Sequence, residues 1–311
     1  MTNRANVGKG LVVAVIGPTA VGKTRLAVKL ARVIGGEIIS CDSMQVYKGM
    51  PVLSQAPSRL ERRNITHHLI GVLDSKREYS VASFRTRATK LIAAIIKRKK
   101  IPIIVGGSGL YIKALVDGLF PSPEADLVFR RKMETLARKR GSALLHERLS
   151  KIDPEAARKI HPNDMKRLIR ALEIYHSTGK TMSELKKQTK GLTDGYKVRM
   201  FGLTMAREKL YGHINERVDR MIAAGAVTEA KRLRKKRLSK TAAMALGLRE
   251  LCDHDLETAR ELLKRNTRRF AKRQWTWFRA DKRIKWFDVS KLGDEAIVAK
   301  IRKEIKRISK R

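Results

Sequence analysis

The chain has 311 residues and carries 70 lysines and arginines against 30 aspartates and glutamates, which gives a formal net charge of +40 and a pI near 10.8. No stretch approaches the roughly 20 apolar residues that a membrane span requires, and the segment before the first apolar run is too short and polar for a signal peptide. We therefore expect a soluble, cytoplasmic protein with one large or two modest domains. The charge favours nucleic acid as a partner, and a general basic bias of the organism is the alternative.

The first predicted strand, Leu11–Ile16, leads directly into GPTAVGKT at residues 17–24 and then into an apolar pattern of helical spacing. This sequence fits the P-loop pattern G-x-x-x-x-G-K-[ST] at every fixed position. Backbone N–H groups and the helix dipole of such a loop bind a di- or triphosphate, Lys23 adds a charge, and Thr24 offers a hydroxyl to Mg²⁺. An anion nest without a ligand is the alternative. The predicted phosphate-binding residues are Gly17, Pro18, Thr19, Ala20, Val21, Gly22, Lys23 and Thr24.

Two further strands are predicted at Glu37–Ser40 and Ile101–Val105, with helical stretches between them, which indicates βα units around a parallel sheet. The turns that follow the three strands should meet where open α/β sheets bind ligands. The strand at 101–105 ends in glycines, whereas enzymes that hydrolyse ATP or GTP usually present an aspartate there. The acidic residue of this edge is Asp42, which suits a general base; capping of the following turn is the alternative.

After Pro121-Ser122-Pro123 the sequence becomes charged and helix-forming as far as a loop predicted at Lys190–Gly195. We expect a helical insertion at residues 121–197 and a P-loop NTPase-like α/β core made of residues 1–120 and 198–311. Arg199–Thr204 should return to the sheet, and helices should continue from Arg207 to the end. Within 270–279, FAKRQWTWFR mixes basic and aromatic residues as surfaces that stack single-stranded bases do; a core helix with a basic solvated side is the alternative.

The cysteines and the paired histidines do not indicate a metal site. Cys41 and Cys252 lie far apart and lack metal-ligand spacing, so we expect two reduced thiols. His67 and His68 lack the i, i+4 spacing of helical ligands, so we expect a structural or loop role.

Nearly the whole chain resembles the tRNA dimethylallyltransferases, also called tRNA isopentenyltransferases. The motifs that carry the resemblance follow the order of that family. They are GPTAVGKT at 17–24, SCDSMQVY at 40–47, HHLI at 67–70, Pro102 with GGSGLY at 106–111, IHPND at 160–164 with Arg167 and RALE at 170–173, NERVD at 215–219, and TRRFAKRQWTWFR at 267–279.

The resemblance implies transfer of a dimethylallyl group from dimethylallyl diphosphate to N6 of the adenosine 3′-adjacent to the anticodon in tRNA, with Mg²⁺ as cofactor. It implies that Asp42, Ser108 and Lys23 are catalytic and that Arg217 binds the diphosphate; a solvated helix face is the alternative for Arg217. A P-loop without a hydrolytic aspartate can hold a diphosphate as a leaving group, and neutralising its developing charge lowers the barrier. We expect a monomer.

The base to be modified must leave its stack, so the resemblance also implies a surface for the anticodon stem-loop. Its residues would be Asp42, Ser43, Met44, Gln45, Ser108, Arg130, Lys166, Arg167, Leu168, Ile169, Arg170, Met244, Ala245, Leu246, Gly247, Leu248, Arg249, Lys272, Arg273, Gln274, Trp275, Thr276, Trp277, Phe278 and Arg279.

Some positions depart from the family pattern. Leu53-Ser54-Gln55-Ala56 stands where Gly-Thr-Ala-Lys is usual, which removes one cation. Ser108 replaces a threonine, Leu248 a tyrosine and His213 an arginine. Two rival functions stay open. One is prenylation of a free adenine nucleotide, which the charge and the insertion disfavour; the other is an RNA-associated P-loop kinase or NTP-dependent binding protein.

Overall fold

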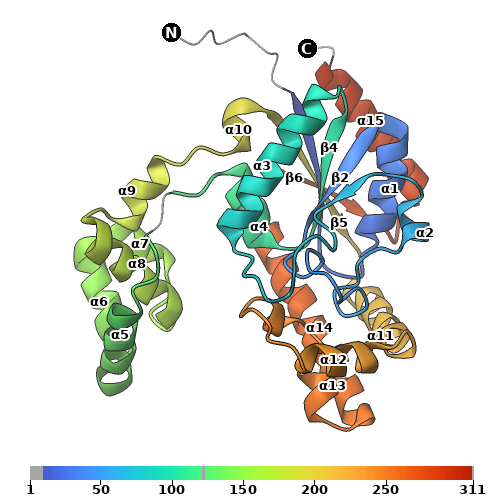
Figure 1. The fold of residues 1–311 in the computed structure, drawn as a ribbon. Helices are drawn as coiled ribbons and strands as arrows, with labels where there is room; N and C mark the ends of the chain where they lie inside the picture. Colours follow the sequence, from blue (N-terminus) through green and yellow to red (C-terminus); the bar gives the residue numbers. More distant parts are fainter. Residues whose placement is uncertain (1–9, 121–122, 310–311) are drawn as a thin grey trace. The chain divides into compact units, whose positions relative to one another are not determined.

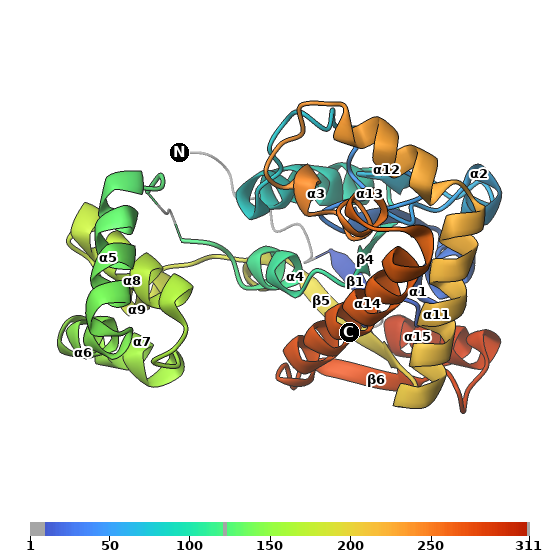
Figure 2. The same cartoon turned by 90° about the horizontal axis from the view of Figure 1, so that it is seen from below.

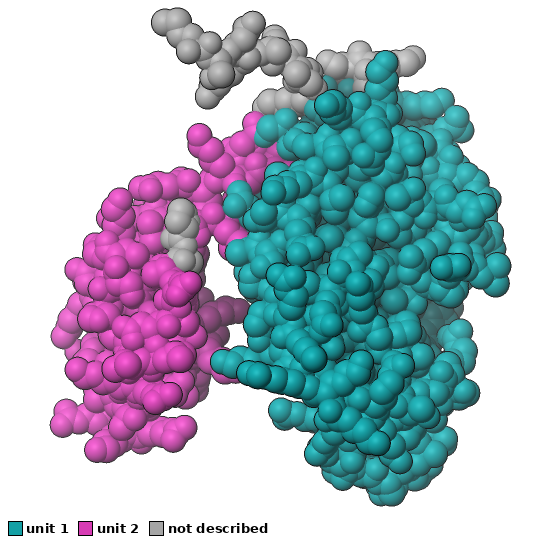
Figure 3. Space-filling view, viewed as in Figure 1, with its two compact units in different colours: residues 1–116, 195–311 teal, residues 117–194 magenta. Residues whose placement is uncertain are grey.

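A computed structural model describes residues 10–120 and 123–309. The chain divides into two compact units, one made of residues up to 116 together with those from 195 onward, the other of residues 117–194 (Figure 3). The boundaries expected from the sequence, after residues 120 and 197, lie a few residues from these. Among the described residues, no helix combines the length and the apolar character that crossing a membrane requires. The segment ahead of the first strand, residues 1–9, and Pro121-Ser122 lie outside the described residues.

The larger unit is built on a six-stranded parallel sheet in the order β3-β2-β4-β1-β5-β6. The strands are β1 (Leu11–Ile16), β2 (Gly36–Cys41), β3 (His67–His68), β4 (Ile101–Gly106), β5 (Lys197–Thr204) and β6 (Ile284–Asp288). Five of the six residues are buried in each of β1, β2 and β4, as a parallel sheet covered on both faces requires. The expected parallel α/β core is therefore confirmed.

Helices cover both faces of this sheet (Figures 1 and 2). Helices α1 (Lys23–Ile34) and α15 (Asp294–Ser309) pack together on one face, and α3 (Val81–Lys97) and α4 (Gly109–Val116) on the other. Leu26 and Leu30 of α1 are fully buried in the core, whereas Val33, which continues the same apolar spacing, is 44% exposed. The short helix α2 (Arg59–Arg62) begins at Ser58 with a capping box.

The remaining helices of the larger unit gather beyond the carboxyl ends of the strands (Figure 1). They are α11 (Arg207–Ala223), α12 (Ala226–Arg234), the 3₁₀ turn η1 (Ala242–Met244), α13 (Glu250–Asp253) and α14 (Leu256–Arg279). Helix α14 packs against both α11 and α4. This placement brings residues late in the sequence to the edge of the sheet where the P-loop lies.

The described residues of the smaller unit form helices and the loops between them, and the unit has its own hydrophobic core around Leu145, Leu149, Leu168 and Leu172. Its helices are α5 (Leu127–Arg140), α6 (Ala143–Ile152), α7 (Pro154–Lys159), α8 (Met165–Thr178), α9 (Met182–Lys187) and the short α10 (Leu192–Gly195) at its boundary. The loop expected at 190–195 is therefore wrong in part, because four of its six residues, Leu192–Gly195, form the short helix α10.

Two further expectations from the sequence concern the edge strands of the sheet, β6 and β3. Helices do not continue from Arg207 to the end, because β6 adds an edge strand. Only Ile284 and Phe287 of its five residues are buried, so its apolar pattern resembles that of the half-buried helices beside it.

The structural role expected for the paired histidines is confirmed, since they form β3 and His68 Nε2 lies 2.7 Å from Glu37 Oε2.

Candidate active site

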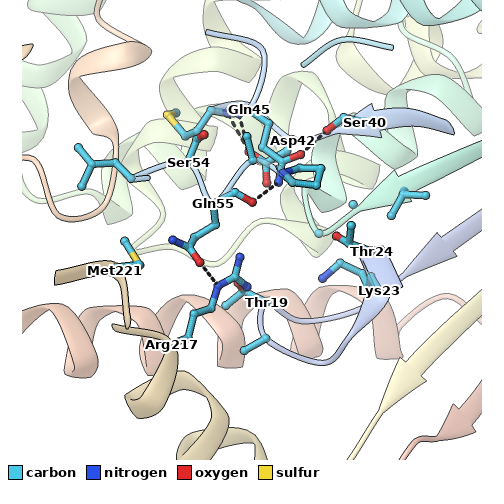
Figure 4. Close-up of a pocket in the computed structure, with 18 of the residues that line it drawn as sticks. Thr19, Lys23, Thr24, Ser40, Asp42, Gln45, Ser54, Gln55, Arg217 and Met221 are labelled. Atoms are coloured by element: carbon cyan, nitrogen blue, oxygen red, sulfur yellow. Dashed lines mark hydrogen bonds between the residues drawn. The ribbon is translucent and has the colours of Figure 1, made fainter. Parts of the chain in front are cut away.

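The three turns that follow β1, β2 and β4 meet in one pocket of about 1580 Å³ inside the larger unit. The P-loop lines one wall, residues 42–45 after β2 line another, and Gly106–Ser108 lie at the end of β4. Helix α11 contributes Arg217 from a distant part of the sequence (Figure 4). The three turns therefore meet at one edge of the sheet, as predicted from the order of strands and helices in the sequence.

The P-loop has the backbone geometry of an anion site. Gly17 has φ 144°, and a Cβ there would lie 2.5 Å from Leu203 O, so no side chain fits. Gly22, with φ 94°, is the N-cap of α1, whose first residues Lys23, Thr24 and Arg25 line the pocket. The amino end of α1, with its unpaired N–H groups and positive dipole, thus faces the space where an anion would bind.

Lys23 is held back against its own loop, since Nζ donates to Pro18 O at 2.6 Å. Burial lowers the pKa of this ammonium to about 7, and the positive charge of Arg217 acts in the same direction, against the smaller opposite effect of Asp42. In the protein without a ligand, Lys23 is therefore only partly protonated at neutral pH. A bound anion would restore the full charge.

This pKa predicts that pyrophosphate binding takes up a proton. Above pH 7 the free protein loses the Lys23 proton and must regain it on binding, so the affinity for pyrophosphate should fall as the pH rises from 7 to 9. Calorimetry in buffers of different ionisation enthalpy measures this uptake. Lys23→Arg is the control, because arginine stays protonated while the ionisation of pyrophosphate itself is unchanged. Equal proton uptake by both proteins would contradict the prediction.

The carboxylate of Asp42 has one oxygen engaged and one available. Oδ1 accepts hydrogen bonds from the backbone N–H groups of Met44 at 2.8 Å and Gln45 at 3.3 Å. Oδ2 has no hydrogen-bond partner among residues 10–120 and 123–309. The capping role is therefore real, and it leaves the second oxygen free for a proton donor in the pocket.

Gln274 connects the P-loop to the turn after β4. Its Oε1 accepts from Thr19 N at 2.8 Å, and its Nε2 donates to Gly107 O at 3.0 Å. A Cβ on Gly107 would lie 2.2 Å from Gln274 Nε2, so this contact needs glycine. Ser108 follows at the pocket wall, and its hydroxyl has no hydrogen-bond partner within the described part of the chain. The Gln274 side chain is 6% exposed and both of its amide atoms are hydrogen-bonded, so it has a structural role; its contact with tRNA stays a prediction.

Arg217 points into the pocket from α11 (Figure 4). Nε donates to Gln55 Oε1 at 2.6 Å and Nη1 to Thr19 Oγ1 at 3.2 Å. Burial is the main cause that lowers the pKa of this guanidinium. The alternative of a solvated helix face is therefore wrong.

The residues expected to contact tRNA fall into three groups, which are buried, half-buried and exposed. The side chains of Leu168, Ile169, Ala245, Leu248 and Phe278 are buried and have a packing role, and Gly247 is also buried; contact of these residues with tRNA stays a prediction. Asp42, Ser43, Met44, Gln45, Ser108, Leu246 and Trp275 are half-buried. The exposed members are Lys166, Arg167, Met244, Arg249, Lys272, Arg273, Thr276, Trp277 and Arg279.

Arg130 and Arg170, in the smaller unit, pair with the fully buried Glu173. Arg130 binds its two carboxylate oxygens at 2.8 and 2.9 Å, and Arg170 also donates to it. Removing one partner of such a buried set leaves an uncompensated charge, which is costly. Both arginines therefore have a structural task that the sequence did not indicate.

The donor set of the pocket fits Mg²⁺ only in combination with a diphosphate. Among the described residues, no group of three or more His, Cys, Asp or Glu side chains could hold a metal ion. Thr24 and Asp42 line the pocket and offer oxygen ligands. Mg²⁺ prefers few protein oxygens together with phosphate oxygens and water, so these residues suit an ion that enters with its anion.

Sequence reasoning missed Gln55 as a partner of Arg217 and Glu229 as an anchor of the neighbouring loop. Glu229 lies on α12 and accepts from the backbone of Val52 and Leu53, at 3.1 and 2.8 Å. Both contacts join positions more than 150 residues apart, and no local pattern marks them.

Comparison with known proteins gives consistent results. The family model described as "IPP transferase" matches residues 45–281. A tRNA dimethylallyltransferase of Halothermothrix orenii is 45% identical over all of this chain and 97% of its own length, and one of Carboxydothermus hydrogenoformans is 49% identical over 93% and 95%. The crystal structure of a full-length tRNA isopentenylpyrophosphate transferase from Bacillus halodurans is 40% identical, covers 96% of both chains and has a TM-score of 0.69. A eukaryotic dimethylallyltransferase acting on tRNA is 32% identical, covers 90% of this chain and 74% of its own, and has a TM-score of 0.75.

Proposed function

We propose, since the chain belongs to the tRNA dimethylallyltransferase family, that it transfers the dimethylallyl group of dimethylallyl diphosphate to N6 of the adenosine 3′-adjacent to the anticodon in tRNA. One observation carries this activity: a P-loop faces a carboxylate with a free oxygen, Asp42 Oδ2, across a single pocket, and β4 ends in glycines. The pocket is thus equipped to bind a diphosphate and deprotonate a nucleophile. The end of β4 does not carry the aspartate that enzymes hydrolysing ATP usually present there.

The leaving group is where the positive charges of the pocket act. As the allylic C–O bond breaks, its electron pair leaves with the diphosphate, whose growing charge is met by the P-loop amides, Lys23 and Arg217. The Ser108 hydroxyl can donate a further hydrogen bond. Mg²⁺, held by Thr24 and the diphosphate, would supply additional positive charge when bound.

The acceptor is the exocyclic amine of adenine, which is a weak nucleophile because its lone pair is delocalised into the ring. The new C–N bond forms as the C–O bond breaks, and the amine must lose a proton. Asp42 Oδ2 takes this proton while Oδ1 keeps the turn in place. Asp42 is therefore a catalytic residue with a fixed orientation.

Mass spectrometry of tRNA incubated with the protein, Mg²⁺ and dimethylallyl diphosphate tests the proposal. We expect one adenosine next to the anticodon to gain a C5 unit. Incubation with ATP and tRNA, and with a free adenine nucleotide as acceptor, are the matched reactions. Phosphate release from ATP without prenyl transfer would support a P-loop kinase or NTP-dependent binding protein. Prenylation of the free adenine nucleotide and not of tRNA would support an enzyme that modifies free nucleotides. We place the reaction in the cytoplasm and expect a monomer to perform it.

The tRNA surface should bind mainly through its charge. Neutralising phosphates releases counterions, so the affinity for tRNA should fall steeply with salt. Lys272 and Arg279 are exposed on α14, and replacing both by glutamine should reduce the slope of log affinity against log salt by about two. Lys300→Gln with Lys303→Gln, on the exposed side of α15 and away from the pocket lining, is the control of equal charge change. A slope that falls equally in both variants would mean that tRNA does not bind at α14.

A further inference from the structure

Residues 51–56 form a loop that lines the pocket between the turn after β2 and helix α2. Glu229, which is 6% exposed, holds this loop from behind through the backbone N–H groups of Val52 and Leu53. Gln55 adopts φ 52°, a left-handed conformation that few residues other than glycine, asparagine and aspartate take up readily. The loop is thus fixed in one conformation that presents Gln55 to the pocket.

The side-chain amide of Gln55 can point only one way. Its Nε2 donates to Val52 O at 2.7 Å, and because a carbonyl only accepts, the amide oxygen must face the other side. On that side Oε1 accepts from Arg217 Nε at 2.6 Å. The backbone carbonyl of Gln55 accepts from Gln45 Nε2 at 3.2 Å, which ties the loop to the turn that carries Asp42.

Arg217 is oriented by two neutral acceptors. Gln55 Oε1 accepts a hydrogen bond from Arg217 Nε and Thr19 Oγ1 accepts one from Nη1, so the plane of the guanidinium is fixed at two points. Neither acceptor carries a charge, so the full positive charge of Arg217 is retained. In the described part of the chain, Nη2 has no hydrogen-bond partner and is free to donate to a ligand.

We infer that Gln55 is a positioning residue that aligns the Arg217 guanidinium with the diphosphate of the prenyl donor without neutralising it. The inference rests on the proposed function for the identity of the donor. The geometry that carries it is the hydrogen-bonded series Val52–Gln55–Arg217–Thr19 along one wall of the pocket. The Gln55 amide is neutral, so it orients the Arg217 guanidinium without adding or cancelling charge.

Gln55→Met tests this, because methionine keeps the volume and apolar length of glutamine and removes both side-chain hydrogen bonds. We expect pyrophosphate binding, measured by calorimetry, to weaken about tenfold, the loss of a hydrogen bond to a charged group. In the transfer reaction, the KM for dimethylallyl diphosphate should rise and kcat should fall, while the KM for tRNA stays unchanged. Gln188→Met, at an exposed position of the smaller unit, is the matched control for pyrophosphate binding.

A double-mutant cycle separates positioning from simple structural support. Lysine at position 217 keeps the charge but has no Nε–H fork to align. Gln55→Met should therefore cost less than about twofold in pyrophosphate affinity when added to Arg217→Lys. A residue that only supports the loop would cost the same in both backgrounds, and thermal melting checks that both variants fold.

Two outcomes would overturn the inference: unchanged pyrophosphate affinity in Gln55→Met, or effects of the two substitutions that multiply independently. Failure of the proposed function would look different. In that case pyrophosphate would still bind with coupling between positions 55 and 217, and no prenyl group would reach tRNA.

Discussion

Asp42→Asn is expected to lower the single-turnover rate of prenyl transfer by about 10²–10⁴-fold while tRNA and pyrophosphate still bind. Asparagine can keep the Oδ1 contacts to Met44 and Gln45, so the turn after β2 should retain its shape. What it loses is the ability of the second oxygen to take a proton from the amine. The measurement is the rate at which a C5 unit appears on tRNA with enzyme in excess, together with tRNA affinity.

Asp42→Ala provides the comparison, because alanine removes both the turn contact and the base. It should retain tRNA binding and lose most turnover, and its melting temperature should fall below that of Asp42→Asn since two backbone N–H groups lose their partner. A near-normal single-turnover rate in Asp42→Asn would refute the role of base. It would leave Asp42 with the capping role alone.

Lys23→Met is expected to lower kcat/KM for dimethylallyl diphosphate by about 10²–10³-fold, the scale on which loss of one preorganised charge-stabilising group acts. Lys23 lies at the amino end of α1, where its charge adds to that of Arg217 on the same leaving group. The effect should divide between weaker pyrophosphate binding and a slower chemical step. Calorimetry with pyrophosphate and single-turnover kinetics measure the two parts separately.

Lys29→Met is the matched control for this substitution. Lys29 lies on the same helix α1, outside the pocket lining, and pairs with Glu295 at 2.6 Å and Asp294 at 3.2 Å. It should change neither pyrophosphate affinity nor turnover. If Lys23→Met left the affinity for pyrophosphate intact, the P-loop would not be the site of the diphosphate.

The first half of the core could be predicted because its signals are local. Leu11–Ile16 is a continuous apolar run followed at once by the P-loop, and the structure has the strand at the same residues. The strand near 37 extends one residue beyond each of its predicted ends, and the strand near 101 extends one residue beyond its predicted carboxyl end. The edge strand β6 was missed because only Ile284 and Phe287 of its five residues are buried, and this three-residue spacing in a short, charged sequence also suits a helix.

The roles of single residues could likewise be predicted only where a local sequence pattern determines them. For Gln274, the basic and aromatic sequence around it predicted a surface, yet α14 turns this side chain inward between Thr19 and Gly107. The pattern of a helix gives its period but not which neighbours stand on each side. The exposed position of Lys272 on the same helix remains in keeping with a nucleic-acid surface.

By itself, the sequence determined the anion-binding loop, the alternation of strands and helices that is typical of a parallel α/β sheet, and Asp42 at the end of a strand, because each is marked by residues that are neighbours along the chain. The tertiary structure decided that Arg217 enters the pocket, that Gln55 aligns it, and that Gln274 holds the P-loop against the end of β4. These contacts join residues between 162 and 255 positions apart. Hydrogen bonds over such distances arise only when packing brings helices α11 and α14 to the carboxyl edge of the sheet, and no local periodicity encodes them.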